Sequence, residues 1–502
     1  MFDPYAAYNA MGAERSGRPA GYGRDADPRD KEQQVSRIVI MGGGPGGYEA
    51  ALVAVQYGAD VTLIERDGLG GACVLSDCVP SKTFIASAGG RTAVLDAGSL
   101  GVTVDPARVG VDVAVVHGRV TGLAMAQSAD IRAKLIADGV RIVDGTARLV
   151  ESEPGRSTHV VVATAPDGSE TDHPADVVLV ATGASPRVLP DAVPDGERIL
   201  TWRQVYSLDE LPEHLIVIGS GVTGAEFASA YTEMGVHVTL VSSRDRVLPS
   251  EDADAAAVIE QVFSARGSVL ARRARAKAVR NTGSGVTVTL EDGRQIDGSH
   301  ALLTVGAVPN TSGIGLERVG VRLGRGGFIE VDRVSRTSVP GIYAAGDCTG
   351  VFMLASVAAM QGRIAMWHVL GEGVAPLRLK TVCANVFTHP EIATVGYSEV
   401  EAETGPALAQ TLMIPLATNA RAKMLGLEEG FVKIVSRRLT GIVIGGVVCA
   451  PEASELILPI AIAVQNRLTV KDLAYTFSVY PSLSGSITEL GRRLMHSDAE
   501  GI

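Results

Sequence analysis

The sequence predicts an α/β protein with two Rossmann-like domains, each built on a parallel sheet. One observation is a motif that occurs twice: a strand, a Gly-x-Gly-x-x-Gly turn, a helix and a second strand. Another is the length of 502 residues, which suffices for about three domains. A third is the balance of 46% hydrophobic and 20% charged residues, which allows a large core and excludes wholesale disorder.

The first copy of the motif begins with a buried-strand pattern at residues 37–41. A glycine turn then opens an alanine-rich helix from Tyr48, and a second strand over 61–64 ends at Glu65. Glycines allow the backbone to approach a pyrophosphate at a helix N-terminus, and an acid after the second strand accepts hydrogen bonds from a ribose. This unit therefore predicts a dinucleotide site formed by Gly42, Gly44, Gly47 and Glu65.

The second copy starts with the strand pattern 215–218 and continues to a second strand over 238–241. Ser242 lies 23 residues after the first glycine of this copy, as Glu65 does in the first copy. A single turn of this kind also arises from packing alone, but two copies with matched second strands favour two nucleotide sites. The turn glycines of the second copy are Gly219, Gly221 and Gly224.

The two copies differ at the residue that follows the second strand. The counterpart of Glu65 is Ser242, which Ser243 and Arg244 follow. A carboxylate there repels a 2′-phosphate, whereas hydroxyls and a guanidinium bind one, so the second site accommodates NADP(H). The alternative is that Arg244 is a solvated loop charge, and these residues permit NADPH without fixing a preference over NADH.

Three further segments follow apolar strands. Residues 182–186, which include Gly183, and residues 304–310, which include Gly306, are predicted to be loops where the chain crosses between the two units. A strand from residue 342 ends in Gly-Asp at Asp347, whose carboxylate is suited to hold a polyol chain. The alternative for Asp347 is a turn or a cap.

Two of the five cysteines, Cys73 and Cys78, lie five positions apart in a segment that continues to Lys82. In a regular helix that spacing separates the Cα atoms by about 7.5 Å, which exceeds the normal disulfide distance. We therefore expect Cys73 in a distorted first helical turn, where the helix N-terminus lowers the thiol pKa and favours redox exchange. The alternatives are a structural bridge or two chance thiols.

Charge and hydropathy exclude several classes of protein. The formal net charge is −11 and no basic block stands out, which argues against nucleic acid as a partner. No apolar run reaches the roughly 18 residues of a membrane span, and no signal-peptide pattern accompanies the sparse cysteines, so we expect a cytoplasmic protein. Residues 1–34 are polar and predicted to be a disordered tail, and Val35 is a candidate native start.

Several motifs occur together in this chain. They are C-x4-C-x-P-S-K at 73–82, the two dinucleotide folds, A-T-G at 181–183, A-A-G-D at 344–347 and F-T-H-P-E at 387–391. With them, the chain from Val35 onward resembles the flavoprotein disulfide reductases, the class I pyridine nucleotide-disulfide oxidoreductases. That group includes dihydrolipoamide dehydrogenase, glutathione reductase, mercuric reductase and soluble transhydrogenase.

The resemblance implies a domain plan. An FAD-binding domain would consist of residues 35–186 and 304–370, with an NAD(P)H-binding domain over 187–303 between its two parts. Residues 371–502 would form an α+β dimerisation domain, so the resemblance also implies a homodimer. FAD and NADPH or NADH are the implied cofactors, and we expect no metal site.

The resemblance also implies roles for individual residues. The first glycine turn and Glu65 would hold FAD, and Lys82 would lie near flavin N5 and pair with Glu226. Cys78 would be the thiol next to the flavin and Cys73 the interchange thiol. Further cofactor-binding positions are Ala147, Gly183, Gly306, Asp347 and Ala355.

The sequence departs from the pattern of the dithiol-using members near its C-terminal end. Those members carry His-Pro and a Glu four residues after the Pro, which together act as acid–base for thiol exchange. Here Tyr480 precedes Pro481, and Ser484 or Gly485 stands at the Glu position. A phenol with a pKa near 10 is a poor thiol base, so we expect a quinone-like acceptor, as in the NAD(P)H:quinone reductase-like paralogues of dihydrolipoamide dehydrogenase. Tyr480 would line the acceptor pocket or pack at the dimer seam.

Three alternatives remain open. Because both cysteines are present, a disulfide acceptor such as lipoamide stays in question. Soluble transhydrogenase also has Tyr before Pro at this place, but its active-site thiol pair is incomplete. A flavin-bearing interaction subunit of a multienzyme complex is the alternative outside the enzyme class.

Overall fold

The computed structural model describes residues 35–151, 158–405 and 408–497, so the predicted tail over residues 1–34 lies outside the described residues. The first motif forms a five-stranded parallel sheet in the order β18-β7-β1-β2-β3. All the apolar residues of its central strand are buried, as expected for a parallel sheet with both faces covered. The strands are β1 (Arg37–Met41), β2 (Asp60–Glu65), β3 (Arg141–Asp144), β7 (Val177–Val180) and β18 (Ile342–Ala344).

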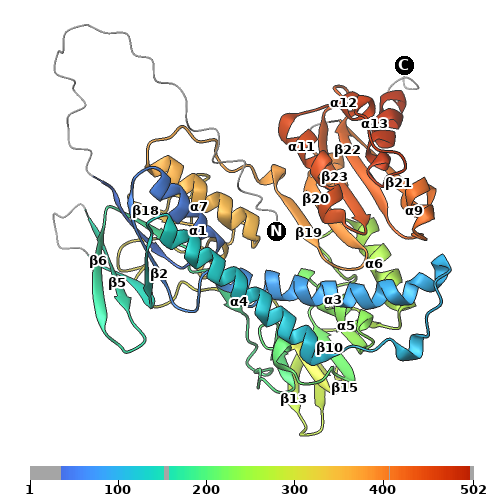
Figure 1. The fold of residues 1–502 in the computed structure, drawn as a ribbon, viewed down its shortest axis with the longest axis horizontal. Helices are drawn as coiled ribbons and strands as arrows, with labels where there is room; N and C mark the ends of the chain where they lie inside the picture. The colour runs from blue at the N-terminus through green and yellow to red at the C-terminus, as the bar shows by residue number, and fades with distance from the viewer. Residues whose placement is uncertain (1–34, 152–157, 406–407, 498–502) are drawn as a thin grey trace. The chain divides into compact units, whose positions relative to one another are not determined.

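Helix α1 (Pro45–Gln56) and helix α7 (Ala355–Val369) lie side by side beside this sheet (Figure 1). Their contact depends on small residues, because a Cβ added at Gly362 would lie 2.1 Å from the carbonyl oxygen of Gly46. A three-stranded antiparallel sheet follows in the chain. Its strands are β4 (Thr146–Val150), β5 (His159–Thr164) and β6 (Glu170–Ala175).

The second motif forms another parallel sheet, in the order β12-β11-β10-β16-β9. Helices α5 (Val222–Glu233) and α6 (Ala253–Ala265) belong to it. Its strands are β9 (Ile199–Thr201), β10 (His214–Ile218), β11 (His237–Val241), β12 (Val269–Ala271) and β16 (His300–Leu303), and an antiparallel sheet adds β13 (Ala276–Asn281), β14 (Val286–Leu290) and β15 (Gln295–Gly298).

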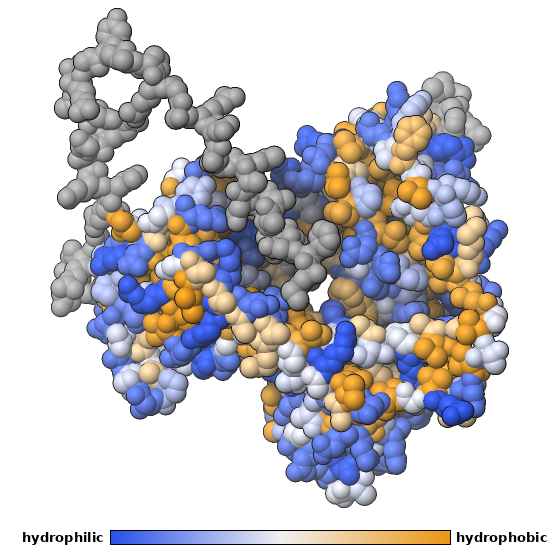
Figure 2. Space-filling view, viewed as in Figure 1, coloured by the Kyte–Doolittle hydropathy of each residue, from blue (hydrophilic) through white to orange (hydrophobic). Residues whose placement is uncertain are grey.

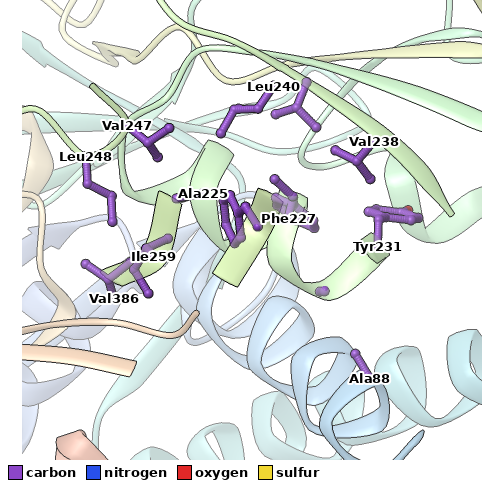
Figure 3. Close-up of a cluster of buried hydrophobic side chains, with 14 of the residues drawn as sticks. Ala88, Ala225, Phe227, Tyr231, Val238, Leu240, Val247, Leu248, Ile259 and Val386 are labelled. Carbon is purple, nitrogen blue, oxygen red and sulfur yellow. The ribbon is translucent and has the colours of Figure 1, made fainter. Parts of the chain in front are cut away.

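A buried cluster joins this unit to neighbouring elements (Figure 3). Phe227 and Tyr231 of α5 pack in one cluster with Val238 of β11. The same cluster contains Ala88 of helix α3 (Cys78–Asp96) and Val386 of strand β19 (Cys383–Val386). Helix α3, which carries the cysteine segment, is therefore fixed against the second unit by hydrophobic burial.

The two predicted crossover loops are partly strands. β8 (Ala184–Pro186) and β17 (Ala307–Pro309) pair as an antiparallel ribbon. The side chain of Asn310 ties the ribbon to the first connection by donating to the carbonyl oxygen of Thr182 at 2.9 Å. The expectation of two plain loops was thus incomplete, because each segment finds a backbone partner only in the other, more than 120 residues away.

The C-terminal region is α+β, as predicted. An antiparallel sheet in the order β19-β20-β23-β22-β21 packs against helices (Figure 1). The other strands are β20 (Glu391–Gly396), β21 (Ala409–Pro415), β22 (Phe431–Arg437) and β23 (Val443–Ala450), and the helices are α8 (Glu399–Thr404), α9 (Ala420–Met424), α10 (Ala453–Leu456), α11 (Leu458–Asn466), α12 (Val470–Tyr475) and α13 (Gly485–Ser497). The fold class is therefore confirmed, whereas the exact domain boundaries stay predictions.

Candidate active site

The two glycine turns have the same local geometry. Gly42 has φ +107° and Gly219 has φ +114°, a region that L side chains rarely adopt. A Cβ at the third glycine, Gly47 or Gly224, would lie 1.9 Å from the carbonyl oxygen of the first. These outer glycines are therefore required by the fold of each turn itself.

A different reason explains why the middle positions, 44 and 221, are glycine. A Cβ at either position would meet no atom within 4 Å. Each is the N-cap of its helix, has extended backbone angles and provides no capping side chain, so the first N–H groups of α1 and α5 are left for another acceptor. An open backbone at a helix N-terminus fits a pyrophosphate, so both turns suit a dinucleotide.

The residues at the ends of the second strands, β2 and β11, differ in structure as well as in sequence. Glu65 lies against the first turn, where its carboxylate accepts a hydrogen bond from the backbone of Gly43 at 2.6 Å. Ser242 is buried, and its hydroxyl is 2.7 Å from that of Ser220 and accepts from the backbone of Arg244 at 3.1 Å. Ser243 and Arg244 are exposed. The structure thus separates the trio into one residue that shapes the loop and two that face outward.

The remaining predicted cofactor positions lie on several elements. Asp347 follows β18 and begins a 3₁₀ turn, and burial together with the nearby charge of Asp77 raises its pKa to about 6. Gly183 and Gly306 both have positive φ, at +67° and +95°. Ala147 is buried in β4, and Ala355 is the first residue of α7.

The cysteine segment is two helices with a break between them. Cys73 lies in the short helix α2 (Gly71–Leu75), and Cys78 is the first residue of α3. The expectation that Cys73 belongs to a distorted first turn was wrong, because non-helical angles at Asp77, φ −128° and ψ −96°, end one helix and start the next. The break removes the spacing of a regular helix, which keeps cysteines five positions apart from meeting.

Both cysteines are free thiols in this structure. Interaction with the neighbouring thiol of Cys78 lowers the pKa of Cys73, although burial and the charges of Asp77 and Asp347 raise it. Interaction with the thiol of Cys73, together with burial, raises the pKa of Cys78. The pair therefore loses one proton readily and holds the second, as a redox-active dithiol does.

One turn further along α3, Lys82 forms an ion pair with Glu226 of α5 across 2.9 Å. The Glu226 side chain is 5% exposed, and its second oxygen accepts from the backbone N–H of Phe387 at 2.9 Å. The Lys82 ammonium also lies 4.9 Å from the centre of the Phe387 ring. Although burial alone would lower the pKa of Lys82, Glu226 and Cys78 raise it overall, so the ammonium keeps its charge beside the thiols.

Tyr480 does not join this group within its own chain. Tyr480 is 85% exposed, and Phe477, three residues before it, is fully exposed. Tyr480 lines a pocket of about 280 Å³ on the C-terminal domain with residues of α12, α13 and the preceding segment. At the position where an acid would orient a histidine, the hydroxyl of Ser484 lies 3.0 Å from that of Ser482.

Comparison with known proteins decides the family. Residues 36–362 match the pyridine nucleotide-disulphide oxidoreductase family, and residues 382–490 match its dimerisation domain. The chain belongs to this family. The family predicted from the motifs is confirmed. The predicted cofactors are confirmed too, because this oxidoreductase family binds FAD and uses NAD(P)H.

The sequence identity of the chain to individual pyridine nucleotide-disulphide oxidoreductases differs from one kind of enzyme to another. An NAD(P)H dehydrogenase (quinone) of Mycobacterium tuberculosis is 63% identical over 92% of this chain and 95% of that protein. The crystal structure of LpdA from M. tuberculosis superimposes with a TM-score of 0.88 at 63% identity, over 92% of this chain and all of that one. Dihydrolipoyl dehydrogenase of Bacillus subtilis is 32% identical over 90% and 94% of the two chains.

Sequence reasoning did not single out Asp77, Arg203 and Tyr206. The charge of Asp77 raises the pKa of both thiols, the charge of Arg203 opposes the rise in the pKa of Asp77, and burial raises the pKa of Tyr206. Asp77 was visible as an acid between two cysteines, but Arg203 and Tyr206 carried no local signal. Among the residues that the structure describes, no helix is long and apolar enough to span a membrane.

Proposed function

We propose that this protein transfers electrons from NAD(P)H through FAD to a quinone-like acceptor. One observation carries the proposal. The Lys82–Glu226 ion pair lies near the Cys73 and Cys78 thiols, with Lys82 in the same chain segment as both, whereas the position of the thiol-exchange base is occupied by Tyr480, which is exposed. An acceptor that takes electrons from reduced flavin needs no such base. The 63% identity to an NAD(P)H dehydrogenase (quinone) supports the same acceptor class.

Each glycine turn would hold one nucleotide. FAD would lie on the 35–186 and 304–370 domain, with Glu65 on its ribose, Asp347 on its polyol chain, and Ala147, Gly183 and Ala355 in further contact. NAD(P)H would lie on the 187–303 domain, with Gly306 near it and with Ser243 and Arg244 toward a 2′-phosphate. Ser242, whose hydroxyl is already bonded within the loop, would fix that loop.

FAD, when bound, accepts a hydride from a nicotinamide and passes electrons on singly or in pairs. The chain's own residues prepare that site. Lys82 would supply a fixed positive charge where negative charge develops, and Glu226 holds the ammonium in place because its other oxygen is anchored on Phe387. Pairing with a buried carboxylate also keeps the lysine from losing its proton.

The two middle glycines allow a paired test of which turn holds which nucleotide. Gly44→Val and Gly221→Val each add a Cβ that meets no protein atom within 4 Å, so we expect both proteins to fold. We expect Gly44→Val to lose FAD by about tenfold or more, and Gly221→Val to keep FAD while its KM for NADPH rises by a similar factor. FAD absorbance per protein and steady-state kinetics measure both. Each variant is the control for the other, and the opposite pattern would reverse the two sites.

The role of the thiols is tested at Cys78. We expect Cys78→Ala to lose any reduction of an external disulfide but to keep menadione turnover within about threefold, because electrons reach a quinone directly from the flavin. Cys383→Ala, at a half-buried thiol of β19, is the control and should change neither activity. Loss of menadione turnover in Cys78→Ala would show that quinone reduction passes through the dithiol.

We further propose a homodimer in the cytoplasm. The chain carries the family's dimerisation domain over 382–490, and hydrophobic side chains reach the surface on the face that Figure 2 shows. Tyr475, Phe477, Val479 and Tyr480 are each at least 70% exposed in the single chain, which a partner subunit would cover. Tyr480 would then face the partner's acceptor site or pack at the seam.

The function itself is tested by steady-state turnover with NADPH and with NADH, each against menadione and lipoamide in parallel. We expect fast menadione reduction and negligible lipoamide reduction. Efficient lipoamide turnover would instead favour the second candidate, a disulfide reductase that acts through the Cys73 and Cys78 thiols. That outcome would require another group to supply the missing base.

A further inference from the structure

An exposed ion pair, Asp245 with Arg273, lies beside the loop that follows strand β11 of the second Rossmann-like unit. Asp245 belongs to that loop, and Arg273 comes two residues after the end of β12. The guanidinium of Arg273 donates to the carboxylate of Asp245, and the two side chains are 80% and 76% exposed. In a dinucleotide-binding unit the residues after the second strand lie at the 2′ position of the adenosine ribose, which is where NADPH differs from NADH. The pair is therefore placed where a coenzyme preference would be set.

Backbone hydrogen bonds join the end of β12 to this loop. Ser242 exchanges them with Ala271 and Ala274, at 2.8 Å each, and the N–H of Arg273 donates to the carbonyl oxygen of Arg244 at 3.0 Å. Arg273 has φ +50°, a left-handed conformation that turns the chain at this point. Arg273 is therefore a direct neighbour of Arg244 in space, although the two residues belong to different loops.

Four arginines lie in these two segments, and two of them are engaged within the protein. Arg246 donates to backbone carbonyl oxygens three and five residues further along the chain, at 3.0 and 2.9 Å. Arg272 makes two hydrogen bonds to the carboxylate of Glu260, at 3.1 and 2.7 Å. The guanidinium of Arg244 has no hydrogen bond or ion pair among the residues that the structure describes. Arg244 and Arg273 are thus the two outward-facing cations of this loop.

A 2′-phosphate needs more charge than Arg244 provides. A phosphate monoester carries about −1.5 to −2 charges near pH 7, and guanidinium groups bind it through paired, charge-assisted hydrogen bonds. An exposed ion pair contributes little stability, so Arg273 can leave Asp245 for a phosphate at small cost. The carboxylate of Asp245 opposes this exchange, because it attracts Arg273 and repels the phosphate.

We propose that Arg273 is a second ligand of the NADPH 2′-phosphate and that Asp245 competes with the phosphate for it. NADH leaves Arg273 on Asp245, whereas NADPH draws the guanidinium to the phosphate. The pair thereby sets the preference between the two coenzymes, with Asp245 limiting how far NADPH is favoured. The proposal rests on the proposed NAD(P)H site of the second unit, but not on the nature of the electron acceptor.

The two charges have opposite expected effects. Arg273→Gln removes a cation from the phosphate and should weaken binding of a 2′-phosphorylated ligand by about tenfold. Asp245→Asn removes the competing carboxylate and should strengthen it by about 3- to 10-fold. Neither change should alter the affinity for a ligand without the 2′-phosphate by more than about twofold. Arg273→Lys keeps the charge but not the planar fork, so it should recover part of the loss.

The test is calorimetric titration of the FAD-loaded enzyme with two adenosine fragments. Adenosine 2′,5′-bisphosphate represents NADPH, and adenosine 5′-monophosphate represents NADH. We expect the wild-type advantage over Arg273→Gln to shrink between about 50 and 300 mM salt, because the cation is exposed and screened. Arg275→Gln is the matched control: Arg275 is also exposed, pairs with Glu291 at 3.8 Å and should change neither affinity.

Steady-state kinetics give the same comparison in turnover. The ratio of kcat/KM for NADPH to that for NADH, with menadione as acceptor, should fall about tenfold in Arg273→Gln and rise in Asp245→Asn. The proposal is overturned if Arg273→Gln leaves the affinity for the bisphosphate unchanged, or weakens both ligands equally, or if Asp245→Asn weakens the bisphosphate. Poor menadione turnover by the wild type would count against the proposed acceptor alone, since the titrations need no acceptor.

Discussion

Replacing Lys82 with Met is expected to slow NADPH oxidation by about 100- to 1,000-fold, the usual cost of removing a preorganised charge from a reacting centre. The substitution removes the only cation within hydrogen-bonding distance that the structure's described residues give Glu226, at 2.9 Å. It leaves behind a carboxylate with 5% exposure, so the local potential changes sign. Stopped-flow measurement of NADPH oxidation by the FAD-loaded enzyme reports the step directly.

Two further variants separate charge from structure at this site. Lys134→Met removes an exposed lysine that pairs with Asp138 on α4, and it should leave the rate unchanged. The double variant Lys82→Met with Glu226→Gln should recover thermal stability and FAD content, because no buried charge is left unpaired, but it should not recover the rate. A Lys82→Met enzyme within threefold of wild type would contradict the role we propose for this lysine.

Replacing Lys433 with Met is expected to lower the free energy of unfolding by about 3–5 kcal/mol, the cost of leaving the buried carboxylate of Asp252 without its partner. Lys433 of β22 is 2% exposed, and its ammonium lies 2.9 Å from Asp252 and from Glu399 and 2.6 Å from Asp254. Asp252 caps helix α6 of the second Rossmann-like unit, so this cation joins that unit to the C-terminal sheet. Urea unfolding measures the loss.

The pH dependence of the Lys433 effect can be given a sign. Burial alone would lower the pKa of Lys433, but its hydrogen bonds to Asp254, Asp252 and Glu399 raise it overall. A group whose folded pKa is raised contributes its full stability below its unfolded value, about 10.4 for lysine, and loses it only as the pH rises through the folded value. The difference between wild type and Lys433→Met should therefore persist, undiminished by lysine titration, from neutral pH to about pH 9.

A matched surface variant controls for the loss of a lysine. Lys423 is exposed on α9, and Lys423→Met should change the free energy of unfolding by less than about 0.5 kcal/mol. Asp252→Asn in the Lys433→Met background should restore part of the loss, because it removes the most buried of the three carboxylates. If Lys433→Met unfolded at the same urea concentration as wild type, the ion cluster would not hold the two parts together.

Much of the fold was predictable because it is encoded locally. The two glycine turns, the strands on either side of them and the acid or serine after the second strand all lie within about 30 residues, and the structure has these strands within one residue of the predictions. The middle glycines needed no tertiary information to be singled out, although only the structure shows that Gly44 and Gly221 face open space. The α+β C-terminal region was predicted from family resemblance and not from its own pattern.

The arrangement of the site was harder to predict from the sequence. The pairing of Lys82 with Glu226 spans 144 residues, and it came from the resemblance, since no local pattern specifies a contact at that separation. The break at Asp77 was missed because helix propensity does not report where two short helices meet. The two crossover segments were predicted as loops because a strand of three residues has no pattern of its own and exists only through its partner.

By itself, the sequence determined the two dinucleotide-binding units, the cysteine segment, the family and the loss of the C-terminal histidine, because each depends on residue identity at fixed local spacing. Tertiary structure alone decided which charges meet: Asp77 among the thiols, Lys433 among three carboxylates, and Tyr480 at the surface of its own chain. The physical reason is that backbone conformation follows from neighbours in the chain, whereas the pKa of a buried group depends on charges that only packing brings within a few ångströms.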